Sequence, residues 1–372
     1  MKKFFSLIPV LLCCFHVQAQ NTNLNLLIGT YTNSGMSEGI YTYNFNTLNG
    51  ETELKSVTKN VDNPSFLALS PDLKSVYSVN ESGSKSAVSA FAFNANDGSL
   101  QLLNKQNSQG ADPCYLTADN KNVIIANYSG GSIAVYGRNE DGSLTEAKQV
   151  IQHAGKSIDP NKRQESAHVH MVQFTPDKKY LICNDLGEDL VYIYNYNPLA
   201  KTAVLTLKTA YKAPAGTGPR HLAFSPNGKF AYLTHEFNGS ITAFIYAKGN
   251  LNRIQEIGTT AKDFTGKIDA ADIHVSPDGK FLYQSNRGDA NTISVFSIYP
   301  TGKLAFISRV STLGKGPRNF AIDPSGRFLL VGNQHSNEVV IFERNKFTGA
   351  LTDSGKRISV GAPVSLTFAQ TN

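Results

Sequence analysis

A turn that recurs about every fifty residues constrains the fold of this chain more than any other feature of its sequence. The turn has the form Ser/Thr-Pro-Asp/Asn-x, and successive copies lie 47 to 56 residues apart when measured at the proline or at its equivalent, Asn120. The copies, one written Asp-Pro-Ser-Gly and one degraded to Ala-Asp-Asn-Lys, begin at Ser70, Ala118, Thr175, Ser225, Ser276 and Asp323. A period of this size predicts a propeller or a solenoid, in which each repeat packs against its neighbours.

The residues around each turn predict four short strands. In the copy at Ser225, the segments are "RHLAFS" before the turn, then "KFAYLTHE", "SITAFIY" and "KGNLNRI". Alternating apolar residues bounded by turn signals indicate strands, and no segment has a helical period. Four strands per repeat are typical of a propeller blade.

The two ends of the chain supply a seventh blade. Residues 362–369, "APVSLTFA", resemble a first strand, and residues 24–54 contain the matching second, third and fourth strands. We therefore predict an all-β, seven-bladed β-propeller of four-stranded blades, closed by pairing of the N- and C-terminal strands. Closure removes the exposed sheet edge that an open ring would leave.

The first nineteen residues have the features of a signal peptide. Lys2 and Lys3 precede an apolar run from Phe4 to Val17, and Ala19 supplies a small residue for cleavage. The run is too short to span a bilayer. We expect 1–19 to be removed and 20–372 to form a single propeller domain that is exported, periplasmic or secreted.

The remaining composition is that of an ordinary globular protein. Hydrophobic residues make up 41% and charged residues 17% of the chain. The formal net charge is +6, but no basic run accompanies it, so we expect no nucleic-acid partner. No second apolar stretch suggests a membrane span. Cys114 and Cys183 lie in apolar, strand-like segments, which favours buried free thiols.

Equivalent positions in the repeats predict where a site lies. The start of each first strand and the end of each second strand should meet at one rim, which is the channel mouth if first strands are innermost. The turns stay alike while these rim residues vary, as in a scaffold that carries a one-sided site. The aligned residues are Ser65, Cys114, His170, Arg220, Ala271, Arg318 and Val364 for the first strands, and Tyr31, Glu81, Tyr128, Asp185, Glu236, Arg287 and Gln334 for the second.

Four of these residues fall in consecutive blades and combine a base, a carboxylate and two guanidinium groups. They are the catalytic candidates His170, Arg220, Glu236 and Arg287. An imidazole beside a carboxylate suits general-base chemistry, and arginines suit an anionic ligand. The candidates for substrate contacts are His168, Arg318, Gln334, Glu81 and Asp185.

Other interpretations of the same residues remain open. Arg220 and Glu236 also fit a structural ion pair within one blade. His168 and His170 also fit two metal ligands, with Glu236 as a third. The sequence contains no Gly-x-Ser-x-Gly elbow, P-loop or dinucleotide fingerprint.

Several segments together resemble the seven-bladed propeller lactonase family, which includes bacterial 6-phosphogluconolactonases and the fungal carboxy-muconate cyclase. The resemblance covers nearly all of the chain after the signal peptide. The segments are "IGTYT" at Ile28, "ANYSGGSIAVY" at Ala126, "RQESAHVHMVQFTPD" at Arg163, "NDLGEDLVYIY" at Asn184, "GPRHLAFSPNGKFAYLTHE" at Gly218, "DIHVSPDGKFLYQSNRG" at Asp272 and "GPRNFAIDPSGRFLLVGNQ" at Gly316.

The resemblance implies a lactone hydrolase with His170, Arg220, Glu236 and Arg287 as its catalytic set. Asp289 stands where the family often has a histidine. The implied substrate is a small anionic lactone, 6-phosphogluconolactone or a related aldonolactone, with no organic cofactor and no metal. The alternatives are a lactone-forming isomerase of the muconate type and a non-catalytic, exported binding propeller. A signal peptide conflicts with the cytoplasmic location of the relatives.

Overall fold

Strands make up nearly all of the regular structure. The computed structural model describes residues 22–33, 35–158 and 162–370, so the predicted signal peptide lies outside the described residues. The described part holds 28 strands and one 3-10 helix, η1 (Gly83–Lys85). Among these residues no helix has the length and apolar character needed to cross a membrane.

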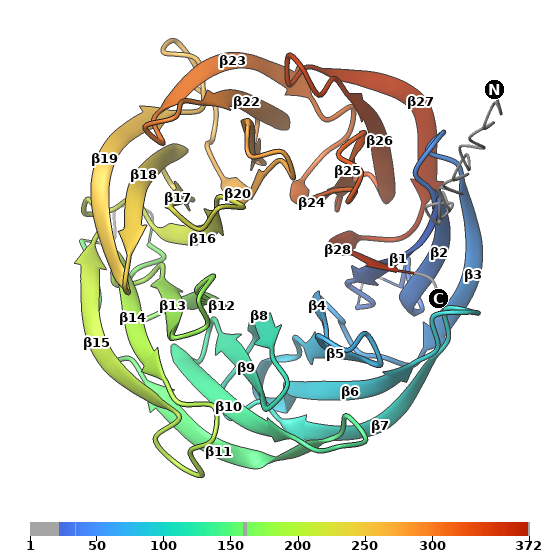
Figure 1. Cartoon of the computed structure of the whole chain (residues 1–372), viewed down its shortest axis with the longest axis vertical. Coiled ribbons are helices and arrows are strands. Elements are labelled where there is room, and N and C mark those ends of the chain that lie inside the picture. Colours follow the sequence, from blue (N-terminus) through green and yellow to red (C-terminus); the bar gives the residue numbers. More distant parts are fainter. Residues whose placement is uncertain (1–21, 34, 159–161, 371–372) are drawn as a thin grey trace, which may run out of the picture.

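The strands form seven antiparallel sheets of four, arranged as blades around a central channel (Figure 1). The blade that joins the chain ends contains β28 (Pro363–Gln370), β1 (Asn23–Thr30), β2 (Gly39–Asn46) and β3 (Thr52–Lys59). The next contains β4 (Phe66–Leu69), β5 (Ser75–Asn80), β6 (Ala87–Phe93) and β7 (Leu100–Asn107). The third contains β8 (Pro113–Ala118), β9 (Asn122–Asn127), β10 (Ser132–Arg138) and β11 (Leu144–Gln152).

The other four blades follow the same plan, with the first strand of each nearest the channel (Figure 1). They contain β12 (Val169–Phe174), β13 (Tyr180–Asp185), β14 (Leu190–Tyr196) and β15 (Leu205–Lys212). Next come β16 (Pro219–Phe224), β17 (Phe230–His235), β18 (Ser240–Ala247) and β19 (Asn250–Gly258). Then come β20 (Ala270–Val275), β21 (Phe281–Asn286), β22 (Thr292–Ile298) and β23 (Leu304–Ser311). The last blade contains β24 (Pro317–Ile322), β25 (Phe328–Asn333), β26 (Glu338–Arg344) and β27 (Leu351–Ser359).

Side-chain hydrogen bonds explain why the proline turn recurs. The Ser225 hydroxyl accepts a hydrogen bond from the Phe230 amide at 3.0 Å and donates one to Asn227 Oδ1 at 2.7 Å. Gly228 follows with φ +68°, a conformation that glycine adopts without steric cost. In the Asp-Pro-Ser-Gly copy the Asp323 carboxylate replaces the hydroxyl and accepts the Phe328 amide at 2.7 Å.

The ring is closed by β28, as the sequence predicts. This strand pairs with β1 from Leu24 opposite Gln370 to Ile28 opposite Leu366. On its other side, the Ser365 hydroxyl accepts a hydrogen bond from the Leu67 amide of the neighbouring blade at 3.1 Å. The last strand of the chain therefore holds two blades together.

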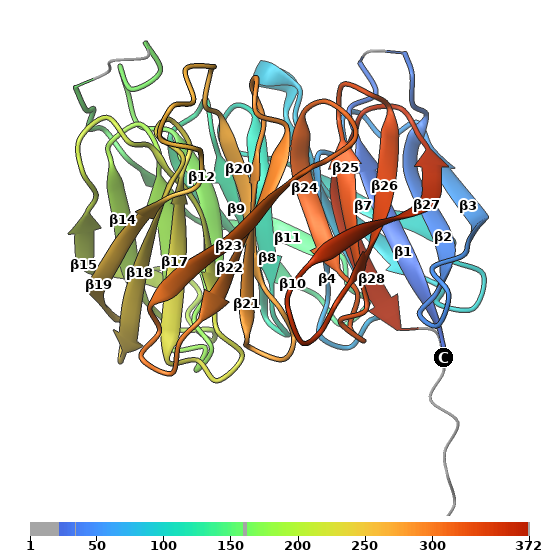
Figure 2. The same cartoon turned by 90° about the horizontal axis from the view of Figure 1, so that it is seen from above.

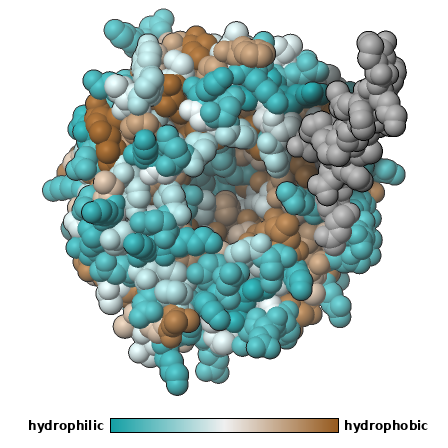
Figure 3. Space-filling model, viewed as in Figure 1, coloured by the Kyte–Doolittle hydropathy of each residue, from teal (hydrophilic) through white to brown (hydrophobic). Residues whose placement is uncertain are grey.

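The apolar core lies between neighbouring blades. Between the last blade and the joining blade, the rings of Phe45 and Phe328 meet edge to face with centroids 5.6 Å apart. Burial of each such ring stabilises the fold by roughly 1.5–3 kcal/mol. Cys114 and Cys183 are buried free thiols, as expected. The central channel leaves a visible hollow in the face shown in Figure 3.

Candidate functional site

The predicted rim residues gather where second strands end and first strands begin, on the face opposite the proline turns. The segment with η1 and the described parts of the connection between β11 and β12 stand up from this same face (Figure 2). Because the turns on the other face are short and alike, the irregular chain that can shape a site is concentrated here.

Glu236 is the centre of the charged cluster at this mouth. It follows β17 directly, and its side chain is 1% exposed. One carboxylate oxygen, Oε2, accepts the Arg220 Nε–H at 2.8 Å. The other, Oε1, lies 2.5 Å from Arg163 Nη1 and 3.4 Å from Arg287 Nη2. Burial raises the pKa of Glu236, but the three arginines outweigh burial and hold that pKa well below its usual range.

Arg287 links Glu236 to a second carboxylate. Its Nη2 lies 2.9 Å from Asp269 Oδ1, and its Nε–H donates to the Asp269 carbonyl at 3.2 Å. Burial raises the pKa of Asp269, with Glu236 adding to the rise against the lowering effect of Arg287. The two carboxylates around Arg287 therefore have pKa values that are shifted in opposite directions.

Arg220 is held rigidly in the same cluster. Besides the bond to Glu236, its Nη1–H donates to the Ala271 carbonyl of the next blade at 2.6 Å. The side chain is 1% exposed. Burial, and then the charge of Arg287, lower the pKa of Arg220 to about 10, which leaves the guanidinium charged at neutral pH.

His170 differs from the arginines because a buried nitrogen of its ring is unsatisfied. The residue is buried, and Nδ1 has no hydrogen-bond partner. The rings of Tyr128 and His221 contact it edge-on, with centroids 5.5 and 5.2 Å away. Burial, followed by the charges of Arg220, His221, Arg318 and Arg287, holds the pKa of His170 well below its usual value. The imidazole is therefore neutral at pH 7.

Arg163 is a member of the cluster that the repeat alignment did not identify. Besides Glu236, it donates to the Tyr128 hydroxyl at 2.6 Å, and its guanidinium carbon lies 5.1 Å from the centroid of the Phe237 ring. Its side chain is 40% exposed, so it covers the buried groups on the solvent side. Arg163 opens the "RQESAHVH" segment, but it lies in a connection without an equivalent in other repeats.

His168 does not join His170 in this cluster. Its Nδ1 lies 3.1 Å from the Tyr128 carbonyl oxygen, and its Nε2 lies 3.4 Å from Glu165 Oε1. The ring stacks on Tyr128 with centroids 4.6 Å apart. Glu236, the third ligand considered for a metal, is occupied by arginines.

Asp185 is one residue out of register with the rim position predicted for it. The amide of Leu186 donates to the His168 carbonyl, just as the amide of Glu236 donates to the Gly218 carbonyl. The apolar Leu186 therefore occupies the rim in this blade. The Asp185 carboxylate is fully buried and accepts the backbone amide of His168, so we leave Asp185 out of the site.

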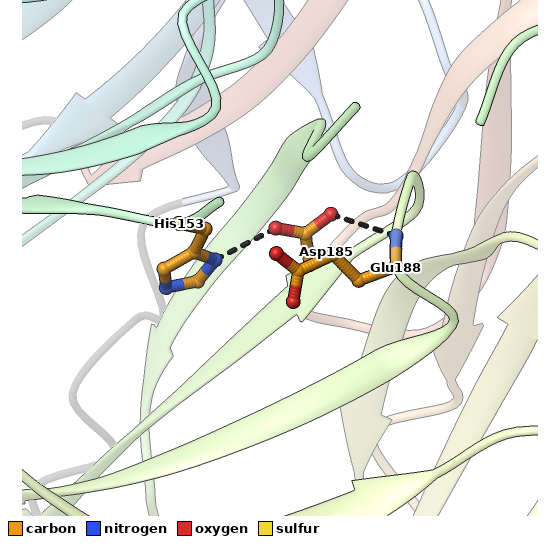
Figure 4. A group of neighbouring side chains, drawn as sticks. All are labelled: His153, Asp185 and Glu188. Carbon is orange, nitrogen blue, oxygen red and sulfur yellow. Dashed lines mark hydrogen bonds and ion pairs between the residues drawn. The ribbon is translucent and has the colours of Figure 1, made fainter. Parts of the chain in front are cut away.

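A group that could hold a metal ion lies where this blade meets the preceding one: His153, which follows β11, with Asp185 and Glu188. Their ligand atoms lie within 4.8 Å of one another, with the imidazole pointing at the Asp185 carboxylate (Figure 4). His153 Nδ1 lies 2.7 Å from Asp185 Oδ2, and His153 Nε2 lies 2.8 Å from the Tyr194 hydroxyl. Glu188 accepts hydrogen bonds from the Gly155 amide and the Tyr192 hydroxyl. The side chains that could bind a metal ion are therefore already engaged in hydrogen bonds within the protein.

The opposite side of the mouth forms an open pocket of about 800 Å³. Three of its lining residues, Glu81, Arg318 and Gln334, are substrate-contact candidates from the sequence. Tyr31 also lines the pocket, and its hydroxyl donates to Glu81 Oε2 at 2.7 Å. The Arg318 guanidinium lies over the Tyr31 ring, 5.5 Å from its centroid. Among the described residues no hydrogen bond or ion pair reaches that guanidinium.

Asp272 connects the first strands of three neighbouring blades, β16, β20 and β24. It lies 2.8 Å from His221 Nδ1 and 2.9 Å from His274 Nε2, and it accepts the Asn319 Nδ2–H at 2.6 Å. Burial raises the pKa of Asp272, but His274 and His221 lower it far more. These contacts join three consecutive blades.

Comparison with known proteins agrees with this geometry. Residues 25–368 match the family model described as "Lactonase, 7-bladed beta-propeller". The chain is 37% identical over 346 residues to the 6-phosphogluconolactonase of Bacillus subtilis, covering 92% of this chain and 97% of that protein. A 6-phosphogluconolactonase of Formosa agariphila is also 37% identical, over 348 residues, with coverage of 92% and 98%.

Solved structures give the same result. A Bacteroides fragilis protein described as a proposed 6-phosphogluconolactonase superposes with a TM-score of 0.91 and 46% identity, over 95% of this chain and 99% of that one. The periplasmic gluconolactonase of Pseudomonas aeruginosa superposes with a TM-score of 0.88 and 36% identity, over 94% of this chain and 100% of that one. The chain therefore belongs to the seven-bladed β-propeller lactonase family of hydrolases.

Proposed function

We propose that the chain hydrolyses a sugar lactone, an aldonolactone, at this mouth, with His170 as the general base. The observation that carries the proposal is the buried, neutral imidazole with an unpartnered nitrogen, on which the charges of the three arginines Arg220, Arg318 and Arg287 act. A neutral imidazole can accept a proton from water, and nearby cations stabilise negative charge that develops in the reaction.

The reaction follows from these groups. His170 takes a proton from a water molecule as the water oxygen attacks the lactone carbonyl carbon, which gives a tetrahedral oxyanion. The ring C–O bond then breaks, the carbonyl re-forms, and the released ring oxygen takes the proton back from the imidazolium. The product acid ionises, so one proton is released to solvent for each lactone opened.

Glu236 has a positioning role in this proposal. Both of its oxygens are engaged by arginines and its pKa is lowered, so it is a poor acceptor for a proton from water. Its charge keeps Arg163, Arg220 and Arg287 together. We assign the oxyanion contact to Arg318, because its N–H groups are not engaged by other described residues.

The relatives named as 6-phosphogluconolactonases and the neighbour named as a gluconolactonase both support an aldonolactone as substrate. No observation favours a lactone-forming isomerase or a non-catalytic binding propeller. Incubation of residues 20–372 with a panel of aldonolactones, followed by acid release in a pH-stat, tests the proposal. Rates above spontaneous hydrolysis are expected for at least one member; none for any member would refute it.

We also propose that the protein is exported. The proposal rests on Lys2, Lys3 and the apolar run that ends before Ala19. Intact-mass measurement on the protein from its native host should give a chain that begins at or near Gln20. A cytoplasmic protein that retains Met1 would contradict export.

A further inference from the structure

The pocket lined by Arg318 has room for more of a ligand than its lactone ring. Its volume, about 800 Å³, is in the upper part of the range of small-molecule sites, roughly 300–1,000 Å³. It shares Arg318 with the proposed catalytic mouth, and the charge of Arg318 acts on His170. A ligand that places its lactone at His170 can therefore extend into this pocket.

The charge of the pocket is unfavourable for a phosphate group. Glu81 and Asp112 both line it, and Arg318 is the one lysine or arginine among the described residues that does so. The three other arginines of the mouth share the carboxylates of Glu236 and Asp269, which offset two of their three charges, and none of the three lines this pocket. A phosphate monoester carries about −1.5 to −2 charges at pH 7 and would face two carboxylates here.

The polar groups of the pocket instead match hydroxyl groups. The Gln334 amide offers donors and an acceptor, and among the described residues it makes no side-chain hydrogen bond. The carboxylates of Glu81 and Asp112 each accept one hydrogen bond from the protein, from the Tyr31 hydroxyl and the Gly83 amide, and keep further acceptor capacity. A sugar hydroxyl both donates and accepts, so it pairs with amides and carboxylates alike.

We infer that this pocket is a subsite for an uncharged sugar ring, so that the preferred substrate class is a glycosylated aldonolactone rather than a phosphorylated one. The inference rests on the proposed lactonase activity and specifies its substrate. The lactone ring lies at His170, and the second ring lies between Gln334 and Glu81.

Three lactones test the inference: glucono-δ-lactone, cellobiono-δ-lactone and 6-phosphoglucono-δ-lactone. The wild-type chain should hydrolyse the disaccharide lactone with a kcat/KM at least about tenfold above the other two, the size expected for one or two additional hydrogen bonds. Gln334→Ala should remove most of the ratio between disaccharide and monosaccharide lactone. The matched control Gln101→Ala, on the outer strand β7, should keep that ratio.

Product binding separates failure of the inference from failure of the proposed function. By calorimetry, cellobionate should bind about tenfold more tightly than gluconate, and Gln334→Ala should abolish the difference. If no lactone is hydrolysed, the proposed activity fails, while the binding difference still decides the subsite. Equal affinities, an unchanged ratio in Gln334→Ala, or a preference for the phosphorylated lactone would overturn the inference.

Discussion

At the scale of single residues, the mouth depends on one buried carboxylate. Glu236 holds three arginines, and both it and Arg220 are 1% exposed. Removing one partner of a buried ion pair leaves an uncompensated charge, which costs more than the pair itself contributes. Glu236 is therefore important for stability as well as for catalysis.

Replacement of Glu236 by glutamine should lower the free energy of unfolding by about 3 kcal/mol, because Arg163 and Arg220 then lose their carboxylate and Arg287 keeps only Asp269. Chemical denaturation of residues 20–372 measures the change. Glu165→Gln is the matched control, since the Glu165 side chain is 62% exposed and should cost little. Equal stability of the two variants would contradict the role assigned to Glu236.

The lowered pKa of His170 predicts that kcat/KM depends on pH in an unusual way. A base acts in its neutral form, so kcat/KM should fall only as pH drops through the lowered pKa of His170. Activity should therefore persist below pH 6.5, the ordinary pKa of histidine. Spontaneous hydrolysis, measured at each pH, is subtracted.

Arg318→Met tests the cause of that shift. Removal of a positive charge that acts on His170 should raise its pKa and move the acid limb to higher pH, besides lowering the rate. Arg253→Met, on the outer strand β19, should leave the limb in place. An acid limb near pH 6.5 in the wild type, or one that does not move in Arg318→Met, would argue against His170 as the base.

The sequence predicts these residues only as far as the repeat extends. Equivalent strand positions place Arg220, Glu236 and Arg287 at one rim, and the structure brings their side chains together. Arg163 could not be found in this way, because it lies in a connection that no other repeat contains. Asp185 was misaligned because it lies nine residues after its turn proline, whereas Glu236 and Arg287 lie ten residues after theirs; Leu186 has the matching spacing.

At the scale of elements, the proline turn and the closing strand determine the architecture. The turn is visible in the sequence because a hydroxyl or carboxylate must accept the same backbone amide in each copy. The closing strand is predicted because a ring without β28 would expose an unpaired edge of β1. Connections such as residues 153–168 contain no repeated motif and no apolar period. The sequence pattern therefore does not predict their conformation.

Removal of residues 361–372 should destabilise the whole ring, because it deletes β28 and its contacts with two blades. The midpoint of thermal unfolding should fall by many degrees, and the transition should broaden. Removal of residues 371–372 alone is the control. An unchanged midpoint after the larger deletion would contradict closure by β28.

At the scale of the whole molecule, the ring separates stability from chemistry. The apolar clusters lie between blades, and the charged residues lie at one mouth of the channel. Because the blades repeat, the sequence predicts the whole fold from one turn and its period. The residues at the mouth differ from blade to blade, so their roles are inferred from their contacts in the structure.

The most direct test of the account is the rate of lactone opening by the wild type and by His170→Asn, measured as acid release from glucono-δ-lactone at pH 6. The account predicts that the substitution lowers kcat/KM by roughly two to four orders of magnitude, the contribution of a general base. His168→Asn, which alters the neighbouring imidazole outside the cluster, should retain far more activity. Full activity in a folded His170→Asn variant would contradict the account.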